Sequence, residues 1–451
     1  MIILGTNSIK DTGYDVANSL RFNDDSQDFL NRTLGTPTNN KKWTYSAWLK
    51  KSSQTDMIMF SCGANNNDRG LIYFNNSGDL NIYGATSGSG TYYLATNRLF
   101  RDNSAWSNIV ISYDSTQSTS TNRIKIYVNG VQETSLSQTT YPAENHNSYF
   151  NSAIRHDISG RMPISSDYLY NGYMAEVCFI DGLQLTPTSF GEFDEDSGIW
   201  KPIDVSGLTF GTNGFYLDFE DSSALGNDAA GSNNFTVNNL TAIDQSTDTC
   251  TNNFATWNAL FRKGTLTPAF SNGNLTSTFD NGGANEFALT SFGADTGKWY
   301  AEVKWISAHG NGATATGILD MAYTGTADPN NAVTNAFGYF GSGTKNVSGS
   351  ASSYGASYGA GDIIGIALNC DDNQVTFYKN GASQGVISII AGVTYGIFTS
   401  DYGSKVAELN TGSPPFAISS GNTDGDGYGN FEYAVPSGYF SLNTKNLAEY
   451  G

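Results

Sequence analysis

The sequence contains two copies of one strand-and-turn pattern, and this duplication constrains the fold more than any other feature. One copy is RIKIYVNGVQE at residues 123–133, and the other is QVTFYKNGASQG at residues 374–385. In each copy, a run of β-branched and aromatic residues ends in Tyr-x-Asn-Gly. Asn-Gly between such runs is the strongest short-range signal for a hairpin, because a type I′ turn needs positive φ at both central residues. We therefore predict two tight hairpins, at residues 129–130 and 380–381.

The two hairpins belong to longer stretches that also match. Residues 42–50 read KWTYSAWLK and residues 298–306 read KWYAEVKWI, and both alternate for about the length of a strand. In the first stretch, one face carries only apolar side chains, which we expect to form core: Trp43, Tyr45, Ala47 and Leu49. This duplication indicates two related β-sandwiches in tandem.

The composition agrees with an all-β chain. The 451 residues include 50 Gly, 26 Tyr and 26 Phe, only 14% are charged, and no long run has the period of an amphipathic helix. Short β-rich runs separated by Gly, Asn, Ser and Asp are typical of sandwiches. We therefore predict two tandem antiparallel β-sandwiches with little helix. The expected strands are 20–22, 43–49, 57–60, 71–74, 80–83, 106–113, 124–128 and 173–180, then 287–292, 299–306, 318–323, 363–368, 375–378, 395–400 and 406–410.

Charge and cysteine usage argue against several classes of protein. A net charge of −19 leaves no basic stripe for a phosphate backbone, so we expect no nucleic-acid partner. The first residues lack a basic region and no apolar run reaches the length of a membrane helix, so we expect neither a signal peptide nor membrane insertion. The four cysteines are too widely spaced for a zinc ribbon, and we predict free buried thiols. They are Cys62, Cys178, Cys250 and Cys370.

Residues 15–203 resemble the LamG-like, concanavalin A-type jelly roll, after an N-terminal segment at residues 1–14. The matching series is WTYSAWLK, LIYFNNSGDLNIYG, WSNIVISYD, IKIYVNG and GYMAEVCFIDGLQLTPTSFGEF. The resemblance implies a strand with an aromatic residue, a tryptophan-led strand, the Asn-Gly hairpin and a closing strand. It implies the fold, and it says little about activity.

Residues 266–451 resemble a SPRY domain with a C-terminal extension. The matching strings are GKWYAEVKW, GDIIGIALNCDDNQVTFYKNG and LNTGSPPF. The extension GNFEYAVPSGYFSLNTKNL resembles the ending of SPRY-bearing proteins from tailed bacteriophages of marine bacteria, which often carry LamG-like domains as well. Residues 204–265 are too short for another sandwich before the SPRY-like part begins, so we predict a linker with extra strands.

An enzymatic interpretation would depend on a pair of carboxylates. The laminarinase-type glycosidases that share the jelly-roll fold carry an ExDxxE pattern, and the nearest string here is at Glu192 and Asp194. This string follows a Thr-Pro turn and lacks the third acid, whereas an acid and a nucleophile must face each other across the bond. The sequence also lacks a nucleophile elbow and has only three histidines, at positions 146, 156 and 309. We therefore predict that the chain is not an enzyme.

One acidic turn has the beginning of a calcium loop. Asn422, Asp424 and Asp426 place oxygen ligands at alternate positions before a glycine. Glu432 falls one position short of the usual bidentate glutamate, and no flanking helices are evident. Calcium is the one cofactor that the sequence leaves open, against a solvated turn without metal.

Three loops combine aromatic and polar residues, as sugar-binding loops on a rigid sandwich do. The candidate ligand-binding residues are Asn65, Asn67, Asp68, Arg69, His146, Asn147, Tyr149, Tyr354 and Tyr358. The alternative is that tyrosine and asparagine are simply abundant in this chain.

The two resemblances together imply a non-enzymatic virion protein of a tailed bacteriophage. It would be a tail fibre, appendage or decoration protein that binds a host surface glycan or envelope protein. The alternatives are a structural assembly protein whose loops contact only other virion proteins, and a glycan depolymerase. We expect a homo-oligomer on the virion surface, synthesised in the host cytoplasm.

Overall fold

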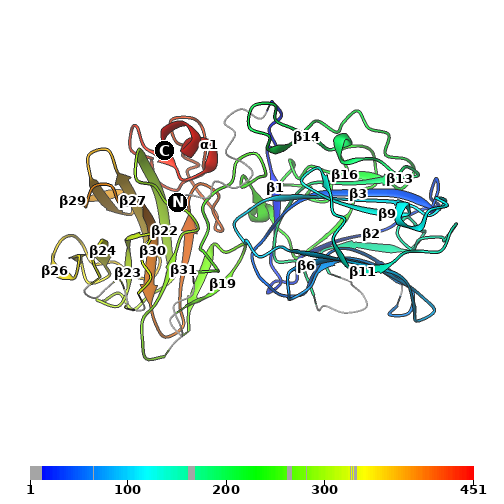
Figure 1. Cartoon of the computed structure of the whole chain (residues 1–451). Helices are drawn as coiled ribbons and strands as arrows, with labels where there is room; N and C mark the ends of the chain where they lie inside the picture. Colours follow the sequence, from blue (N-terminus) through cyan, green and yellow to red (C-terminus); the bar gives the residue numbers. More distant parts are fainter. Residues whose placement is uncertain are drawn as a thin grey trace. The chain divides into compact units, whose positions relative to one another are not determined.

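The computed structural model describes residues 13–63, 65–160, 168–261, 267–280, 282–325, 327, 329 and 333–451. Strands dominate these residues, and their one α-helix is α1 (Thr444–Tyr450). The chain divides into two compact units after Thr251, and each unit contains two large sheets (Figure 1). The prediction of two tandem all-β sandwiches is confirmed. None of the described helices is long and apolar enough to cross a membrane.

The first unit contains two eight-stranded antiparallel sheets. One has the order β10 (Val131–Gln132), β9 (Ile124–Val128), β8 (Ser107–Asp114), β3 (Lys42–Lys51), β13 (Gly172–Asp181), β1 (Ser19–Phe22) and β18 (Gln245–Ser246), with β16 (Phe215–Leu217) paired to β13. The other has the order β11 (Leu136–Thr140), β7 (Ser89–Leu99), β6 (Asp79–Thr86), β5 (Arg69–Phe74), β4 (Met57–Gly63), β12 (Arg155–Ile158), β2 (Phe29–Thr33) and β17 (Thr236–Asn238). Outside them lie the hairpin β14 (Gly191–Phe193) and β15 (Trp200–Pro202), and the 3-10 turns η1 (Ser120–Asn122), η2 (Pro187–Ser189) and η3 (Ala242–Asp244).

The core of the first unit lies between its two sheets. The β3 face predicted from alternation, which carries Trp43 and Tyr45, is fully buried, and the ring of Tyr45 stacks on that of Phe60 at 5.2 Å between centroids. The opposite face of β3 is buried too, because a further layer covers it. There Trp48 packs in a second apolar cluster, and the Lys50 ammonium pairs with Asp248 at 2.7 Å. All four cysteines are buried and none forms a disulfide.

Three short strands lie in the described part of residues 204–265, and they pair with strands of the first unit. β16 pairs with β13, β17 pairs with β2, and β18 pairs with β1. This segment therefore extends both sheets of the first sandwich.

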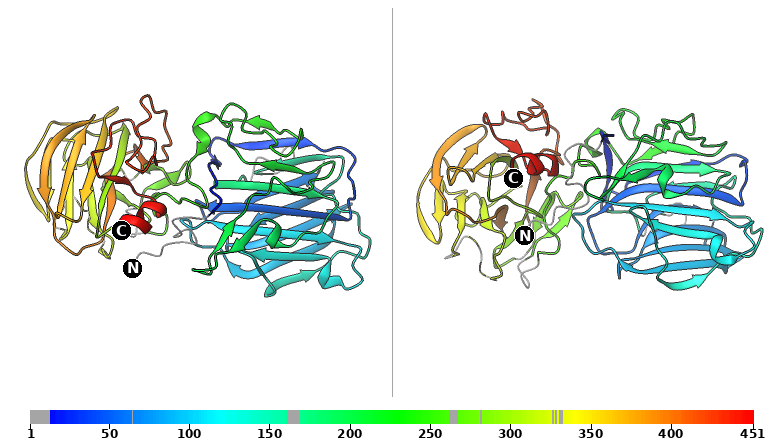
Figure 2. Two further views of the ribbon diagram at one scale, coloured as in Figure 1. Left: turned by 90° about the horizontal axis from the view of Figure 1, so that it is seen from above. Right: turned by 45° about the horizontal axis from the view of Figure 1, so that its top comes forward.

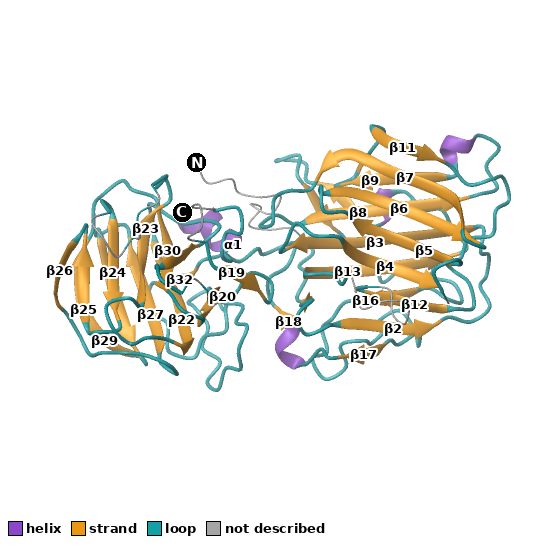
Figure 3. Cartoon of the chain, turned by 90° about the horizontal axis from the view of Figure 1, so that it is seen from below, coloured by secondary structure: helices purple, strands orange, loops and turns teal. Residues whose placement is uncertain are grey.

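The second unit contains sheets of eight and six strands, which Figure 3 shows as two layers. The larger has the order β19 (Ala269–Ser271), β20 (Thr276–Phe279), β31 (Lys405–Asn410), β22 (Lys298–Ser307), β27 (Ile363–Asn369), β28 (Gln374–Lys379) and β29 (Ala382–Ser388), with β32 (Phe440–Ser441) parallel to β22. The smaller has the order β21 (Glu286–Leu289), β30 (Tyr395–Asp401), β23 (Ala315–Asp320), β24 (Ala336–Phe340), β25 (Thr344–Val347) and β26 (Ser350–Ser353).

Two of the strands expected in the second unit end earlier than predicted. The strand expected at 287–292 ends at Leu289, and the one expected at 318–323 ends at Asp320. In the second case the Asp320 carboxylate accepts a hydrogen bond from the backbone of Ala322 and closes a turn. An aspartate that caps a turn in this way ends a strand even where apolar residues follow.

Both predicted Asn-Gly turns have the expected backbone. The φ angles are 47° at Asn129 and 78° at Gly130, and 48° at Asn380 and 77° at Gly381. These positive values are those that a type I′ turn requires. In the second unit, the C-terminal segment, red in Figure 2, packs on the larger sheet. There the ring of Phe431 lies 5.2 Å from that of Tyr300, between centroids.

Candidate ligand-binding sites

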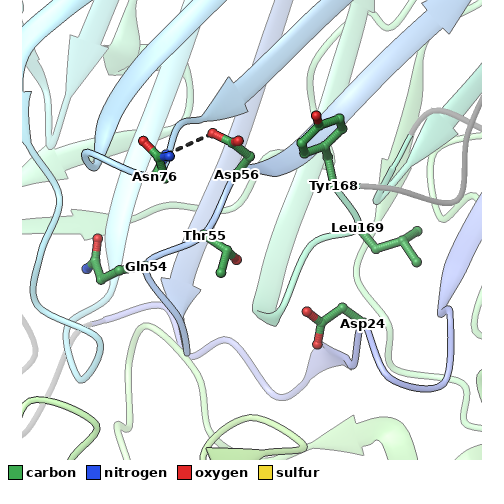
Figure 4. A pocket seen from close by; sticks show the side chains of 7 residues that line it. All are labelled: Asp24, Gln54, Thr55, Asp56, Asn76, Tyr168 and Leu169. Carbon is green, nitrogen blue, oxygen red and sulfur yellow. Dashed lines mark hydrogen bonds between the residues drawn. The ribbon is translucent and has the colours of Figure 1, made fainter.

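One end of the first sandwich carries a groove formed by described residues. Its volume is about 450 Å³, and Figure 4 shows the residues that line it: Asp24, Gln54, Thr55, Asp56, Asn76, Tyr168 and Leu169. A second hollow of about 400 Å³ shares Asp56, Asn76 and Tyr168 with it and continues past Tyr73. We call the two together the Tyr168 groove.

Loops at the ends of several strands build this groove. Residues 54–56 lead into β4, and Asn75 and Asn76 form the turn between β5 and β6. Tyr168 and Leu169 lead into β13. The backbone carbonyl of Tyr168 accepts a hydrogen bond from Ile58 N of β4 at 2.8 Å. Loops on a rigid sandwich commonly carry binding residues in this way.

Tyr168 presents an exposed aromatic ring at the centre of the groove. Its side chain is 43% exposed, and its φ of 64° places it in the left-handed region, which a bulky residue rarely adopts. Such a conformation costs on the order of 1–3 kcal/mol and is often found at ligand sites. An exposed ring beside a cavity can stack on the apolar face of a sugar.

Two carboxylates line the groove together with this ring, and Figure 4 shows Asp56 as the nearer of the two. Asp56 Oδ1 accepts a hydrogen bond from the backbone N of Asn76 at 2.8 Å, and Asp24 accepts one from the Asn171 side chain. Within its own turn Asp24 also accepts local backbone bonds, while burial and the neighbouring Asp25 raise its pKa. Each carboxylate therefore makes one hydrogen bond to a residue outside its own turn, which leaves acceptor capacity for a ligand.

The Gln54 side chain lines the groove, but its amide is already hydrogen-bonded to neighbouring residues. Its amide nitrogen donates to the carbonyl of Phe100 at 3.1 Å and to Asn103 Oδ1 at 3.0 Å. Its amide oxygen accepts from Lys51 Nζ at 3.2 Å. The groove thus offers a ring, two acids and the exposed Asn76 and Thr55, which is a set suited to a polyol.

The structure brings two of the predicted loops together at the opposite end of the same sheet. The Tyr149 hydroxyl donates to Asp68 Oδ1 at 2.7 Å, and the backbone N of Ser87 donates to the same oxygen at 2.9 Å. These hydrogen bonds lower the pKa of the Asp68 carboxyl. Asn65 Oδ1 accepts from the backbone of Asn67 and Asp68, so this loop is internally bonded.

The remaining predicted residues of these two loops, Arg69, His146 and Asn147, each have different surroundings. The Arg69 guanidinium lies 5.5 Å from the Tyr83 ring centroid and donates to the carbonyl of Asn66. His146 is half-buried with its ring edge against Tyr92, and burial lowers its pKa. Asn147 is exposed.

The tyrosine pair predicted in the second unit does not form an exposed platform. Tyr358 is 3% exposed, packs on Tyr339 at 4.7 Å between centroids and donates its hydroxyl to the carbonyl of that residue. Tyr354 is half-buried and donates its hydroxyl to the carbonyl of Gly385. Tyr358 is therefore a core residue, and its selection as a ligand contact is corrected on that ground.

In the predicted calcium turn, hydrogen-bond donors of the protein itself satisfy the Asp424 carboxylate. The Asp424 carboxylate accepts five hydrogen bonds, from Asp426 N, Tyr428 N, Ser441 N and Oγ, and Asn446 Nδ2. Asn422 donates its side-chain amide to Ser420, and Asp426 accepts from the Tyr450 hydroxyl. No group of three His, Cys, Asp or Glu side chains in the described part of the chain is placed to hold a metal. The aspartate pattern here holds the C-terminal helix.

Glu192 and Asp194 lie on an exposed hairpin and share one cation. Lys201 Nζ lies 3.5 Å from Glu192 and 3.4 Å from Asp194. Asp194 also accepts hydrogen bonds from the backbone and hydroxyl of Ser197, and these bonds lower its pKa. This arrangement is that of a capped turn with an ion pair.

The Tyr168 groove was not predicted from the sequence. Its residues come from four places in the chain, and none of the segments has a recognisable pattern of its own. The one local signal is the turn Asn75-Asn76-Ser77-Gly78 between two predicted strands, which marks a loop without marking a cavity.

Comparison with known families agrees with the fold. Residues 23–187 match the family described as the concanavalin A-like lectin/glucanases superfamily, and residues 298–396 match the SPRY domain family. The chain thus contains a concanavalin A-like domain and a SPRY domain. A search of curated proteins found no match.

Several solved structures are similar to parts of the chain. The SPRY domain of human HERC1 is 20% identical, with 30% of this chain and 87% of that chain covered and a TM-score of 0.27. A SAP-like pentraxin from Limulus polyphemus is 16% identical, with 38% and 80% covered and a TM-score of 0.28. A "putative carbohydrate binding protein" from Bacteroides ovatus is 16% identical, with 50% and 59% covered and a TM-score of 0.36.

Proposed function

We propose that this chain is a non-enzymatic glycan-binding protein of a tailed-phage virion surface, and that its first domain holds the sugar in the Tyr168 groove. The observation that carries the proposal is that the exposed ring of Tyr168 and two carboxylates, Asp24 and Asp56, line one cavity of about 450 Å³. The family match of this domain includes lectins, which favours a carbohydrate ligand. Stacking on the ring would supply affinity, and the carboxylates would orient hydroxyl groups.

The phage setting rests on the resemblance of the whole chain, with a LamG-like domain followed by a SPRY domain and the long C-terminal extension. In that setting the glycan would belong to the host surface, and the second domain would contact other virion proteins. Antibodies raised against the second domain should label purified particles of the phage that encodes the chain. Absence of the chain from such particles would contradict this part of the proposal and leave the sugar site untouched.

The binding site is tested by one substitution and its matched control. Tyr168→Ala should weaken binding on a glycan array about tenfold or more, because aromatic anchors commonly contribute about 2 kcal/mol at a binding site. Phe193→Ala is the control, since Phe193 is as exposed, at 48%, and lies outside the groove. Equal binding by both variants would overturn the groove as the sugar site.

A glycan depolymerase is the second candidate, and the acids of the groove now favour it more than Glu192 and Asp194 do. A carboxyl whose pKa is raised, such as Asp24, can act as a general acid opposite a second carboxylate. Release of reducing ends from a bound glycan, abolished by Asp24→Asn, would establish the depolymerase. Binding without release would support the non-enzymatic function.

A further inference from the structure

We infer that the Tyr168 groove selects neutral or amine-bearing sugars and excludes glycans that carry carboxylate, sulfate or phosphate groups. This inference deepens the proposed function and rests on it. It concerns the charge of the ligand, which the fold of the domain does not determine.

The charges on the described residues that line the groove are all of one sign. Asp24 and Asp56 are the charged members among the described residues that line its two hollows, and neither hollow is lined by a described lysine or arginine. Other acids add to this field. Asp25 lies close enough to Asp24 to raise its pKa, and Asp56 and Asp79 both help to raise the pKa of Tyr73. An anionic ligand would therefore meet several like charges, and none of the described lining residues offers it a counter-charge.

Lys51 is a described cation near the groove, and its ammonium points into the protein. Lys51 Nζ donates to the carbonyl of Phe100 at 2.8 Å and lies 4.8 Å from the Phe74 ring centroid. The residue is 4% exposed, and burial lowers its pKa to about 8. Because its ammonium is bonded behind Gln54, it cannot neutralise an anion on the ligand without leaving these partners.

The acids of the groove favour ligands rich in hydrogen-bond donors. An ionised carboxylate only accepts hydrogen bonds, so it pairs with sugar hydroxyls or with a protonated amine and repels another acceptor of like charge. Partial enclosure strengthens this discrimination, because charges interact more strongly where water is displaced. Bringing like charges together at a binding surface costs enough free energy to exclude a partner.

The test uses the full chain and glycans that differ only in charge. Tetrasaccharides of glucose, glucosamine and glucuronic acid with the same β-1,4 linkage are titrated calorimetrically at pH 6 and low salt, beside an array that holds matched neutral, amino and acidic members of other backbones. We expect the acidic member of each bound set to bind about tenfold more weakly than the neutral one. This difference should shrink in about 0.5 M salt.

Two double variants sharpen the result. Asp24→Asn with Asp56→Asn should bring the affinities for acidic and neutral members together and weaken the amino member. The control, Glu195→Gln with Asp196→Asn, removes the same charge from an exposed loop that does not line the groove, and it should leave the preference intact. A control that changes the preference equally would assign it to the net charge of the chain and overturn the inference.

The possible outcomes distinguish a failure of this inference from a failure of the proposed function. If Tyr168→Ala abolishes binding and the acidic members bind as well as the neutral ones, the charge selection is wrong and the sugar site stands. If chelator abolishes all binding, a bridging cation carries recognition, and the inference is overturned. If no glycan of any charge binds, the proposed function fails and the inference falls with it.

Discussion

Acidic side chains serve different ends in the two domains. In the second domain, Glu302 is fully buried and accepts four hydrogen bonds, from the Tyr300 hydroxyl, Asn410 Nδ2 and the backbone N–H groups of Glu432 and Tyr433. In the Tyr168 groove of the first domain, Asp24 and Asp56 each accept one hydrogen bond from outside their own turns. The buried acid organises the fold, whereas the groove acids keep acceptor capacity at the surface.

This difference teaches how to separate structural carboxylates from candidate binding residues. Asp424 matched the beginning of a calcium loop in the sequence, yet its five donors make it a structural acid like Glu302. A carboxylate with every lone pair satisfied by the protein has nothing to offer a ligand unless these bonds break. The predictions below test this distinction.

The largest effect should come from removing the buried acid of the second domain. Glu302→Ala leaves two backbone N–H groups and the Tyr300 hydroxyl without their acceptor, which should lower the free energy of unfolding of that domain by about 3–5 kcal/mol. Denaturant unfolding of the second domain measures it, with glycan binding as a second readout that should not change. Glu195→Ala, at an exposed site, should shift stability by less than about 0.5 kcal/mol. A loss below about 1 kcal/mol for Glu302→Ala would contradict the structural role.

A pH effect of similar size should come from Glu176 in the first domain. Burial raises its pKa from 4.5 to about 7, although the Tyr216 and Tyr14 hydroxyls donate to it, and Asp218 and Glu220 raise it further. Because the folded pKa is raised, its contribution to stability is full below pH 4.5 and is lost as the pH rises through 7. The shift corresponds to about 3 kcal/mol.

Glu176→Gln isolates this contribution from those of other buried acids. Burial also raises the pKa of Asp157 to about 7 and that of Asp28 to about 6, so these act in the same direction. The difference in unfolding free energy between the parent and Glu176→Gln, followed from pH 4.5 to 8, should grow in favour of the variant. A difference that is flat with pH would show that Glu176 titrates normally.

The groove acids should be nearly dispensable for folding. Asp24→Asn and Asp56→Asn keep a side-chain acceptor for Asn171 and for Asn76 N, so each should change the free energy of unfolding by less than about 1 kcal/mol. For Asp24, whose carboxylate is disfavoured by burial and by Asp25, the change should be stabilising at neutral pH. Thermal unfolding of the first domain tests both. A large loss would place these residues with Glu302 and remove the contrast.

Calcium should have the smallest effect. Because Asp424 already accepts five hydrogen bonds, millimolar calcium should leave the unfolding temperature of the second domain unchanged, and chelator should do the same. A hundredfold excess of calcium over its Kd would stabilise the domain by about 2.7 kcal/mol. A rise of that order, lost in Asp424→Ala, would return the turn to the candidate metal sites.

Features that depend on neighbouring residues were readable from the sequence. The two Asn-Gly turns have the predicted φ angles, and the predicted face of β3, which carries Trp43 and Tyr45, lies in the core. Local periodicity and turn chemistry determine such features, so they can be predicted without the fold.

Features that depend on distant segments could not be predicted. The Lys50 ammonium on the outer face of β3 is buried with a partner, because Asp248, about 200 residues later, pairs with it. Tyr358 was chosen as a ligand contact because it lies in a polar, aromatic loop, yet it is core because Tyr339 and the segment around it enclose it. The Tyr168 groove joins four loops, so its cavity exists only once the sheet has brought them together.

Deamidation at the two hairpin Asn-Gly turns can report whether each domain has unfolded. Glycine has no Cβ to shield its backbone nitrogen, so an asparagine before it readily cyclises and loses its amide in a mobile chain. In the folded turns, Asn129 Oδ1 accepts from Asn108 N at 2.7 Å, and the Asn380 side chain bonds to Asp362 and to Ile363 N. These bonds fix the orientation of both side chains in the folded turns. Deamidation at Asn129 or at Asn380 would therefore mark, chemically and permanently, which of the two domains has opened during storage.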